Sequence, residues 1–219
     1  GKLIYIFGAD KIGSLDLSGC TPKNSNWMIA DCTLLRKLII GGTDYTPAYT
    51  TDILSALSLG QMPFLEEIDI RNTKILTLNA SGCPRLKSVL AEGSLLKTFN
   101  VAEASPIETL HLPGSMTDLK FVNLPKLSYV KGGGMTIEGF ANVKTLTVNG
   151  CPDIDGVSLL TDVVNGGATL TGVSIAGIRT IGEASVLQSL KSAGTIGLNS
   201  EDKTVCDGLS GQWTMKKYT

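Results

Sequence analysis

The chain has 219 residues, a charged fraction of 18% and a formal net charge of −1 at pH 7. Because it has no basic excess to release counterions from nucleic acid and no apolar run as long as a bilayer is thick, we expect neither a nucleic-acid partner nor membrane insertion of this segment. The 25 glycines suit short strands joined by tight turns, and they argue against an all-helical fold.

The N-terminal part of the chain is predicted to begin with a strand at residues 3–7, which have β-branched and aromatic character and stop at a glycine. An apolar phrase follows in residues 12–22. It matches the second half of the repeat described below, so we expect the repeats to begin here. Residues 27–34 fit either a short helix or an irregular cover, and the sequence leaves this open. Residues 35–40 spell the phrase again.

Between Thr43 and Leu65 the second strand of the repeat is predicted to be replaced by a helix. Thr51 or Asp52 can cap this helix, and it is expected to end at Gly60. The apolar residues predicted to face the flank of the solenoid are Ile53, Leu54 and Leu57.

The stretch from residue 65 to residue 131 writes one apolar phrase three times and then starts again. Each copy spells apolar-x-x-apolar-x-apolar twice. Equivalent positions of the first halves, Ile68, Val89, Leu110 and Val130, follow at intervals of 21, 21 and 20 residues. A fixed period near twenty indicates a solenoid. Two phrases per copy predict two parallel ladders of strands, and we call the strands of the first halves the first ladder and those of the second halves the second ladder.

After residue 131 the regularity loosens. The triplet Gly132-Gly133-Gly134 is predicted to form a tight bend, Ile137 and Phe140 fit a distorted second half, and residues 143–151 restate the phrase. The remaining predicted elements are a helix at residues 157–164, a strand at 170–175, a helix at about 183–192, and strands at 195–198 and 209–218.

These elements predict one domain over residues 1–219, an α/β solenoid dominated by parallel β-structure with two strand ladders and a few short helices. Residues 1–11 are expected to form an N-terminal cap strand, residues 12–180 the repeats, and residues 181–219 a C-terminal cap. Both ends carry larger aromatic side chains than the middle, as terminal repeats that cover an open core do.

At the phrase itself the sequence resembles the leucine-rich repeat family, whose strand signature is Leu-x-x-Leu-x-Leu-x-x-Asn/Cys. The stretches IGSLDLSGC, LTLNASGCP and VKTLTVNGC match this signature closely, and LEEIDIRNT and IETLHLPGS match it with Thr or Ser at the last position. The resemblance covers about residues 10–180 and implies a right-handed superhelix. The doubled form of about 21 residues is similar to compact repeats in surface and secreted proteins of Bacteroidetes-type bacteria and in virion proteins of their phages.

The residue types needed for catalysis or metal binding are sparse. His111 is the single histidine, no G-x-S-x-G motif accompanies it, and no pattern for zinc or calcium is present. We therefore predict no enzyme activity, no cofactor and no metal. The five cysteines lack a C-x-x-C pair, which argues against a disulfide framework although one bridge stays open. Cys20, Cys83 and Cys151 follow glycines at turns and are predicted to be small buried thiols.

The remaining candidates for function are outward-facing strand positions, which form the binding surface in leucine-rich repeats. The second ladder offers blander Thr and Asn residues: Thr77, Asn79, Thr98, Asn100, Thr145 and Thr147. Its hydroxyl and amide groups could equally bind sugars, and the first ladder also fits a solvated surface with no ligand. The predicted partner-binding residues, all assigned to the first ladder, are Glu67, Asp69, Arg71, Ser88, Glu92, Thr109, His111, Tyr129 and Lys131.

The function predicted from these features is a non-enzymatic interaction module that binds a protein or a glycan. The alternative is a structural component of a phage virion or a surface layer, without a separable ligand. The resemblance implies an extracellular or bacterial cell-surface location, or a virion. Because the sequence starts at Gly1 and not at Met, we expect it to be a processed product or a trimmed piece of a longer chain.

Overall fold

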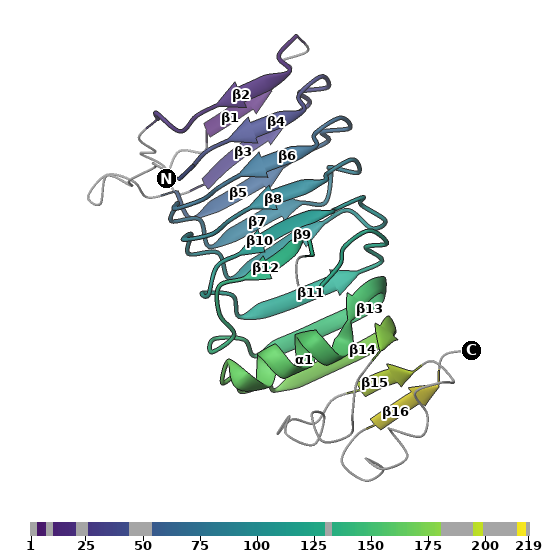
Figure 1. Ribbon diagram of the computed structural model, residues 1–219. Coiled ribbons are helices and arrows are strands. Elements are labelled where there is room, and N and C mark those ends of the chain that lie inside the picture. The colour runs from purple at the N-terminus through teal and green to yellow at the C-terminus, as the bar shows by residue number, and fades with distance from the viewer. Residues whose placement is uncertain are drawn as a thin grey trace.

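The protein is a parallel β-solenoid in which short strands stack along the long axis of the molecule (Figure 1). The computed structural model describes residues 4–7, 11–20, 26–43, 54–129, 133–180, 195–198 and 214–217. Every strand pairing in it is parallel. The predicted solenoid and its parallel β-structure are therefore confirmed.

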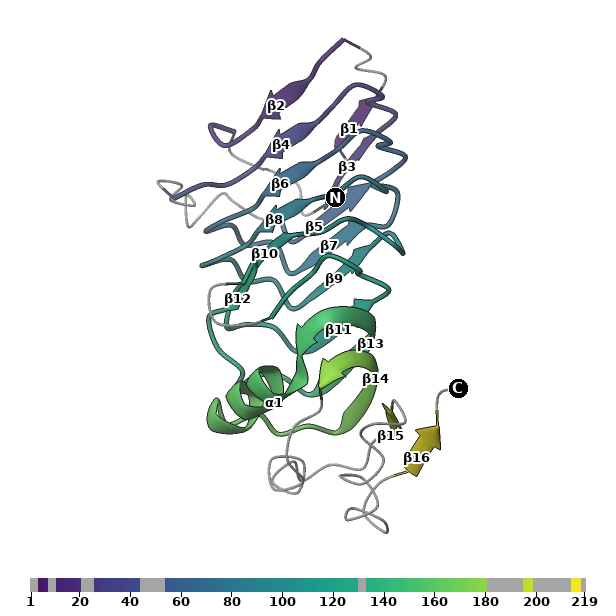
Figure 2. The same ribbon diagram turned by 45° about the vertical axis from the view of Figure 1, so that its right-hand side comes forward.

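The first ladder is one six-stranded sheet with the order β12-β10-β8-β6-β4-β2. Its neighbours along the sheet are alternate strands of the chain, because each rung contributes one strand here and one to the opposite flank (Figure 2). Its strands are β2 (Ser14–Asp16), β4 (Lys37–Ile39), β6 (Glu67–Asp69), β8 (Ser88–Leu90), β10 (Thr109–Leu112) and β12 (Met135–Ile137).

The second ladder consists of two five-stranded sheets, β1-β3-β5-β7-β9 and β11-β13-β14-β15-β16. The second ladder is interrupted between β9 and β11, which are successive strands of this ladder but belong to different sheets. The strands are β1 (Ile4–Phe7), β3 (Asn26–Ala30), β5 (Ala56–Leu59), β7 (Thr77–Ala80), β9 (Thr98–Val101), β11 (Asp118–Val122), β13 (Thr145–Asp155), β14 (Gly172–Thr180), β15 (Thr195–Leu198) and β16 (Thr214–Lys217).

The core lies between the ladders and is made by the apolar positions of the phrase. Strand side chains alternate between the two faces of a sheet, so every second residue points inward. One inward row of the first ladder runs through residues that stand in register from rung to rung and are fully buried in its middle. In register order this row is Leu15, Leu38, Ile68, Val89, Leu110 and Met135.

Two segments that looked irregular or helical are strands of the second ladder. In β3, Trp27 and Ile29 are buried and stand in register with Leu57 and Leu59 of β5. The prediction of a helix ending at Gly60 was wrong, because Leu57 and Leu59 alternate into the core between β3 and β7. The proposed cap residues of that helix, at positions 51 and 52, lie outside the described residues.

The first phrase was assigned to the wrong half of the repeat. Residues 14–16 form β2, which pairs with β4 in the first ladder and not with a strand of the second. Cys20 therefore aligns with Thr73 and Ser94, which follow β6 and β8 at the same distance, and not with Cys83. Cys20 is exposed, so the prediction of a buried thiol was wrong for it, whereas Cys83 and Cys151 are buried as predicted.

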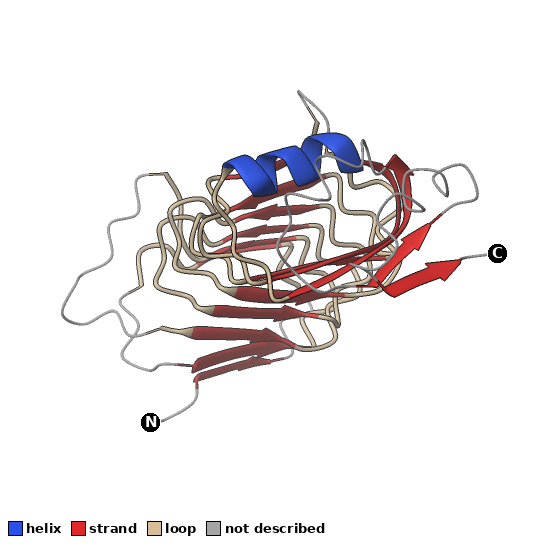
Figure 3. Ribbon diagram, turned by 90° about the horizontal axis from the view of Figure 1, so that it is seen from below, coloured by secondary structure: helices blue, strands red, loops and turns tan. Residues whose placement is uncertain are grey.

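The glycine triplet shifts the register of the first ladder. Met135 pairs with Leu110, so the interval in this ladder is 25 residues here and not the predicted 20. Beyond β12, helix α1 (Gly156–Asn165) continues the column of the first ladder, connects β13 to β14 along the chain and packs against both (Figures 1 and 3). It confirms the helix predicted at residues 157–164. The helix predicted at residues 183–192 lies outside the described residues.

Candidate functional site

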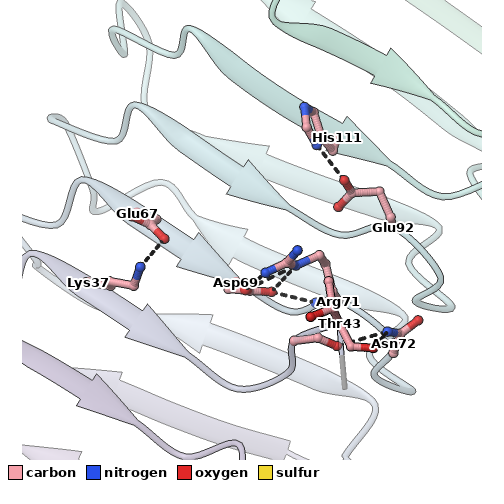
Figure 4. A network of polar contacts seen from close by, with 9 residues as sticks. Lys37, Thr43, Glu67, Asp69, Arg71, Asn72, Glu92 and His111 are labelled. Carbon is pink, nitrogen blue, oxygen red and sulfur yellow. Dashed lines mark hydrogen bonds and ion pairs between the residues drawn. The ribbon is translucent and has the colours of Figure 1, made fainter. Parts of the chain in front are cut away.

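The outward face of β6, β8 and β10 brings most of the predicted binding residues together. Parallel pairing in register places Glu67, Ser88 and Thr109 in one row across three strands. A second row, one step along each strand on the same face, contains Asp69 and His111. Arg71 and Glu92 follow β6 and β8 directly, so they extend this surface at the carboxyl ends of the strands (Figure 4). We call it the first-ladder surface.

Asp69 and Arg71 form a pair that is rigid and largely shielded from solvent. The Arg71 guanidinium donates from Nε to Oδ1 at 3.0 Å and from Nη2 to Oδ2 at 2.6 Å, and its backbone N–H donates to Oδ1 at 3.1 Å. The Asp69 side chain is only 6% exposed and that of Arg71 26%. The hydrogen bond from Arg71 to Asp69 raises the pKa of the guanidinium, so this fork stays charged at all accessible pH values.

His111 and Glu92 form a second pair, between β10 and the residues that follow β8. The imidazole Nδ1 lies 2.5 Å from Oε1 of Glu92. Glu138, which follows β12, reaches past the β10 rung, and its carboxylate accepts from the backbone N–H of Gly93 after β8 at 3.1 Å. An ion pair joins Lys37 and Glu67 across β4 and β6 at 2.6 Å. Rungs are thus linked by polar contacts on the outside as well as by the core.

The corner before the first ladder carries alternating charges. Arg36 and Lys87 each pair with Glu66 at 3.1 Å, and this hydrogen bonding lowers the pKa of the carboxyl. The Phe64 ring lies between two guanidinium groups, with the Arg85 carbon 4.5 Å from the ring centre and that of Arg36 5.6 Å away. These groups are exposed and screened by water, so they align neighbouring rungs more than they stabilise them.

Sequence reasoning missed two aliphatic residues on the first-ladder surface. Ile39 and Leu90 stand in the same outward row as Asp69, one on each side of it, and both are half-buried. The signal was present in the sequence, because Ile39 and Leu90 occupy the position between the second and third apolar residues of their phrases, where Asp69 and His111 stand in other rungs. An apolar residue at an outward position marks a surface that is not wholly polar.

Tyr129 is not part of the first-ladder surface. It forms an isolated parallel bridge with Ile154, and its hydroxyl donates to Oδ2 of Asp162 in α1 at 2.6 Å. The register shift at the glycine triplet removes it from the ladder, because β12 and not residue 129 pairs with β10. The prediction of its place was therefore wrong. Lys131 lies outside the described residues.

Replacing Tyr129 by Phe is expected to lower the free energy of unfolding by about 1 kcal/mol, the usual net value of one hydrogen bond. Burial, and then the contact with Asp162, raise the pKa of Tyr129 in the folded state. Because the pKa of Tyr129 is higher in the folded state, the stabilisation by its neutral hydroxyl is complete below the pKa of the unfolded chain, near 10. It is lost as the pH rises from there through the pKa of the folded chain. Urea unfolding of both chains at about pH 8 and about pH 10.5 measures it. A difference between the chains that is constant or grows with pH would contradict the assignment.

The second ladder presents a polar surface with few charges. Thr77 and Thr98 stand in one row and Asn79 and Asn100 in the next, which confirms that these Thr and Asn positions align. Asn79 is occupied locally, because its Oδ1 accepts from the backbone N–H of Ser81 at 3.2 Å. Further along, Thr145 and Thr147 of β13 stand in register with Asp118 and Lys120 of β11, and the Thr145 hydroxyl donates to Asp118.

The described residues contain no group of three or more His, Cys, Asp or Glu side chains placed to hold a metal ion. Within those same ranges no helix is long and apolar enough to cross a bilayer. The buried Cys83 thiol is unreactive, since burial raises its pKa to about 12. Within the described part of the chain, the candidate site is the first-ladder surface.

The fold and the first-ladder surface define a parallel β-solenoid that displays a mixed charged and aliphatic face on one flank and a Thr/Asn face on the other. Comparison with known protein families, curated proteins and solved structures gave no match. The class is therefore defined by the fold alone.

Proposed function

We propose that the protein is a non-enzymatic interaction module, similar to leucine-rich repeats, that binds a protein or glycan partner through the first-ladder surface. The observation that carries the proposal is the in-register array of outward side chains on β6, β8 and β10, fixed by the Asp69–Arg71 and Glu92–His111 pairs. Side chains already held in one position lose less conformational entropy when a partner binds.

The composition of this surface supports the same proposal. Half-buried Ile39 and Leu90 stand in register on either side of Asp69, which binds Arg71, and aliphatic area near an Arg with a rim of charges is typical of protein interfaces. The middle of the second ladder is blander, because the aligned outward positions of β7 and β9 are Thr and Asn. An extracellular or bacterial cell-surface location fits such a module, and the resemblance that suggests it extends to virion proteins.

A structural role in a virion or surface layer is the second candidate. It is favoured by the apolar residue Ile12, which is 41% exposed at the N-terminal end of the solenoid. Assembly through the ends of the solenoid needs no ligand on either ladder.

Binding measurements on two matched sets of variants test the proposal. The purified chain is screened on an array of defined glycans and against a displayed peptide library, and affinities for the selected probes are measured by calorimetry. We expect Glu67→Ala, Leu90→Ala and His111→Ala each to weaken binding by about tenfold or more, the effect of a central interface residue. Asp69 is left intact because its buried carboxylate holds Arg71.

The control set is Thr77→Ala, Thr98→Ala and Asn100→Ala on the second ladder, which are expected to leave the affinity unchanged. All six variants are expected to show the thermal unfolding of the parent chain. Equal losses in both sets, losses confined to the second ladder, or failure of every probe to bind would each contradict the proposal. Failure to bind together with self-assembly would favour the structural role.

A further inference from the structure

Among the described residues, the rung at the N-terminal end of the solenoid has no further rung stacked on its outer side. β2 and β1 are the edge strands of their sheets, and both lie at this end (Figures 1 and 2). β1 is a regular member of the second ladder, since Ile4 to Phe7 pair in register with Trp27 to Ala30. It does not cross the end of the core, so neither edge strand has a strand beyond it among the described residues.

The apolar residues of this rung show what the end presents. Ile12 occupies the first position of the phrase, as Leu35 and Leu65 do in the next two rungs. Leu35 and Leu65 are fully buried because a preceding rung covers them, whereas Ile12 is 41% exposed. Leu15, further along the same phrase, is only partly buried. The end therefore offers the same apolar surface that each rung inside the array offers to the rung before it.

The backbone of β2 adds a row of hydrogen-bonding groups that have no partner among the described residues. Gly13 O accepts from the backbone N–H of Arg36, and Leu17 N–H donates to Ile39 O, so residues 13 and 17 face β4. Peptide groups of a strand alternate sides, so the N–H and C=O groups of Ser14 and Asp16 face away from the sheet. An edge of this kind pairs readily with another strand.

We propose that this end binds a second copy of the chain, end to end, with β2 antiparallel to the β2 of the second copy. A two-fold axis normal to both ladders pairs the two β2 strands on one flank and brings the β1 strands together on the other, and it keeps every inward residue inside. The same self-complementary surface serves on both copies. A second copy of the chain can cover this end because it presents the same apolar residues there.

Charge and hydrogen bonding select one register for this pairing. Centring the axis on Leu15 places Ser14 of each copy opposite Asp16 of the other. In an antiparallel sheet such residues exchange both N–H···O bonds, which satisfies all the free groups of the edge. Moving one strand by two residues in one direction removes the pair of N–H···O bonds that Asp16 makes with Ser14 of the other copy. Moving it by two residues in the other direction places the two Asp16 side chains opposite each other, where like charges repel.

Sedimentation equilibrium of the 219-residue chain tests the proposal. We expect a dimer whose dissociation constant rises at least tenfold in Ile12→Lys, which places a charge at the junction. Asp16→Pro is expected to act similarly by removing an outward N–H that makes no bond to any described residue. The matched control is Leu95→Lys, an exposed leucine elsewhere that is 48% accessible, and it should dimerise like the parent.

Hydrogen exchange gives a second readout that does not depend on any variant. The amides of Ser14 and Asp16 are expected to exchange more slowly as the protein concentration rises through the dissociation constant. A chain that stays monomeric, a dimer unaffected by both end variants, or equal weakening by Leu95→Lys would overturn the proposal. Because His111→Ala lies on the first-ladder surface, it should leave the dimer intact, so this test is separate from that of partner binding.

Discussion

Replacing Leu110 by Ala is expected to lower the free energy of unfolding by about 2–5 kcal/mol, the range for emptying a fully buried leucine site. Leu110 is fully buried and stands in the inward row between Val89 and Met135. A cavity at this site removes packing contacts with the rung on each side. In a stacked array each rung is stabilised mainly by its neighbours, so the loss also weakens the contact between the two halves of the solenoid.

Urea unfolding followed by circular dichroism measures this change. The control is Thr109→Ala, one residue away on the outward face, which is expected to change stability by less than about 0.5 kcal/mol. Leu15→Ala, in the same inward row but on the terminal rung, is expected to fall between the two because Leu15 is only partly buried. A Leu110→Ala loss as small as that of Thr109→Ala would show that the inward row does not hold the array together.

The inward rows were predictable because the phrase and the fold share one periodicity. Leu65, Ile68 and Ile70 alternate with polar residues at the spacing that puts all three on one face, and the next copy repeats them at a fixed interval. Parallel stacking then places equivalent residues in register. The alignment of Ile68 with Val89 and Leu110 follows from sequence alone, and with it the place of the outward residues between them.

The first and third rungs could not be assigned in the same way. Both halves of the repeat have identical apolar spacing, so residues 12–17 fit either ladder, and the cysteine at position 20 pointed to the wrong one. In the third rung, Leu54 and Leu57 are three residues apart and indicate a helix, whereas Leu57 and Leu59 are two apart and indicate a strand. A segment this short fits both the helical and the strand spacing of apolar residues. It forms a strand because it pairs with β3 on one side and β7 on the other.

Within the candidate site, the burial of Asp69 was not predictable. Its position in the phrase is outward, but the Arg71 side chain folds back onto it and Ile39 and Leu90 flank it in the same row. Tyr129 was misplaced for a different reason, since the phrase at residue 127 reads like a new rung. The chain leaves the ladder there, and backbone contact between Met135 and Ser128 closes the intervening loop. The length of such a loop is not encoded in the apolar phrase.

Gly134 is the residue that allows the chain to rejoin the ladder after this loop. Its carbonyl accepts from the backbone N–H of Leu110 at 2.8 Å. A β-carbon at position 134 would lie 1.7 Å from the carbonyl oxygen of Glu108, which is backbone of the neighbouring rung and cannot turn aside as a side chain would. Two rungs thus approach too closely at Gly134 for any other residue. Gly132 of the predicted tight bend lies outside the described residues, so the bend stays a prediction.

Gly134→Ala is therefore expected to cost about 3 kcal/mol or more, because β12 must move away from β10 and lose its pairing at the edge of the first ladder. The matched control is Gly139→Ala, just beyond β12, where the nearest atom to a new β-carbon is 3.8 Å away and the substitution should be nearly neutral. Urea midpoints of both variants measure the difference. Hydrogen exchange at Leu110, whose amide bonds to Gly134, should accelerate in Gly134→Ala alone. Equal stability of the two variants would mean that β12 does not hold its place through this close approach.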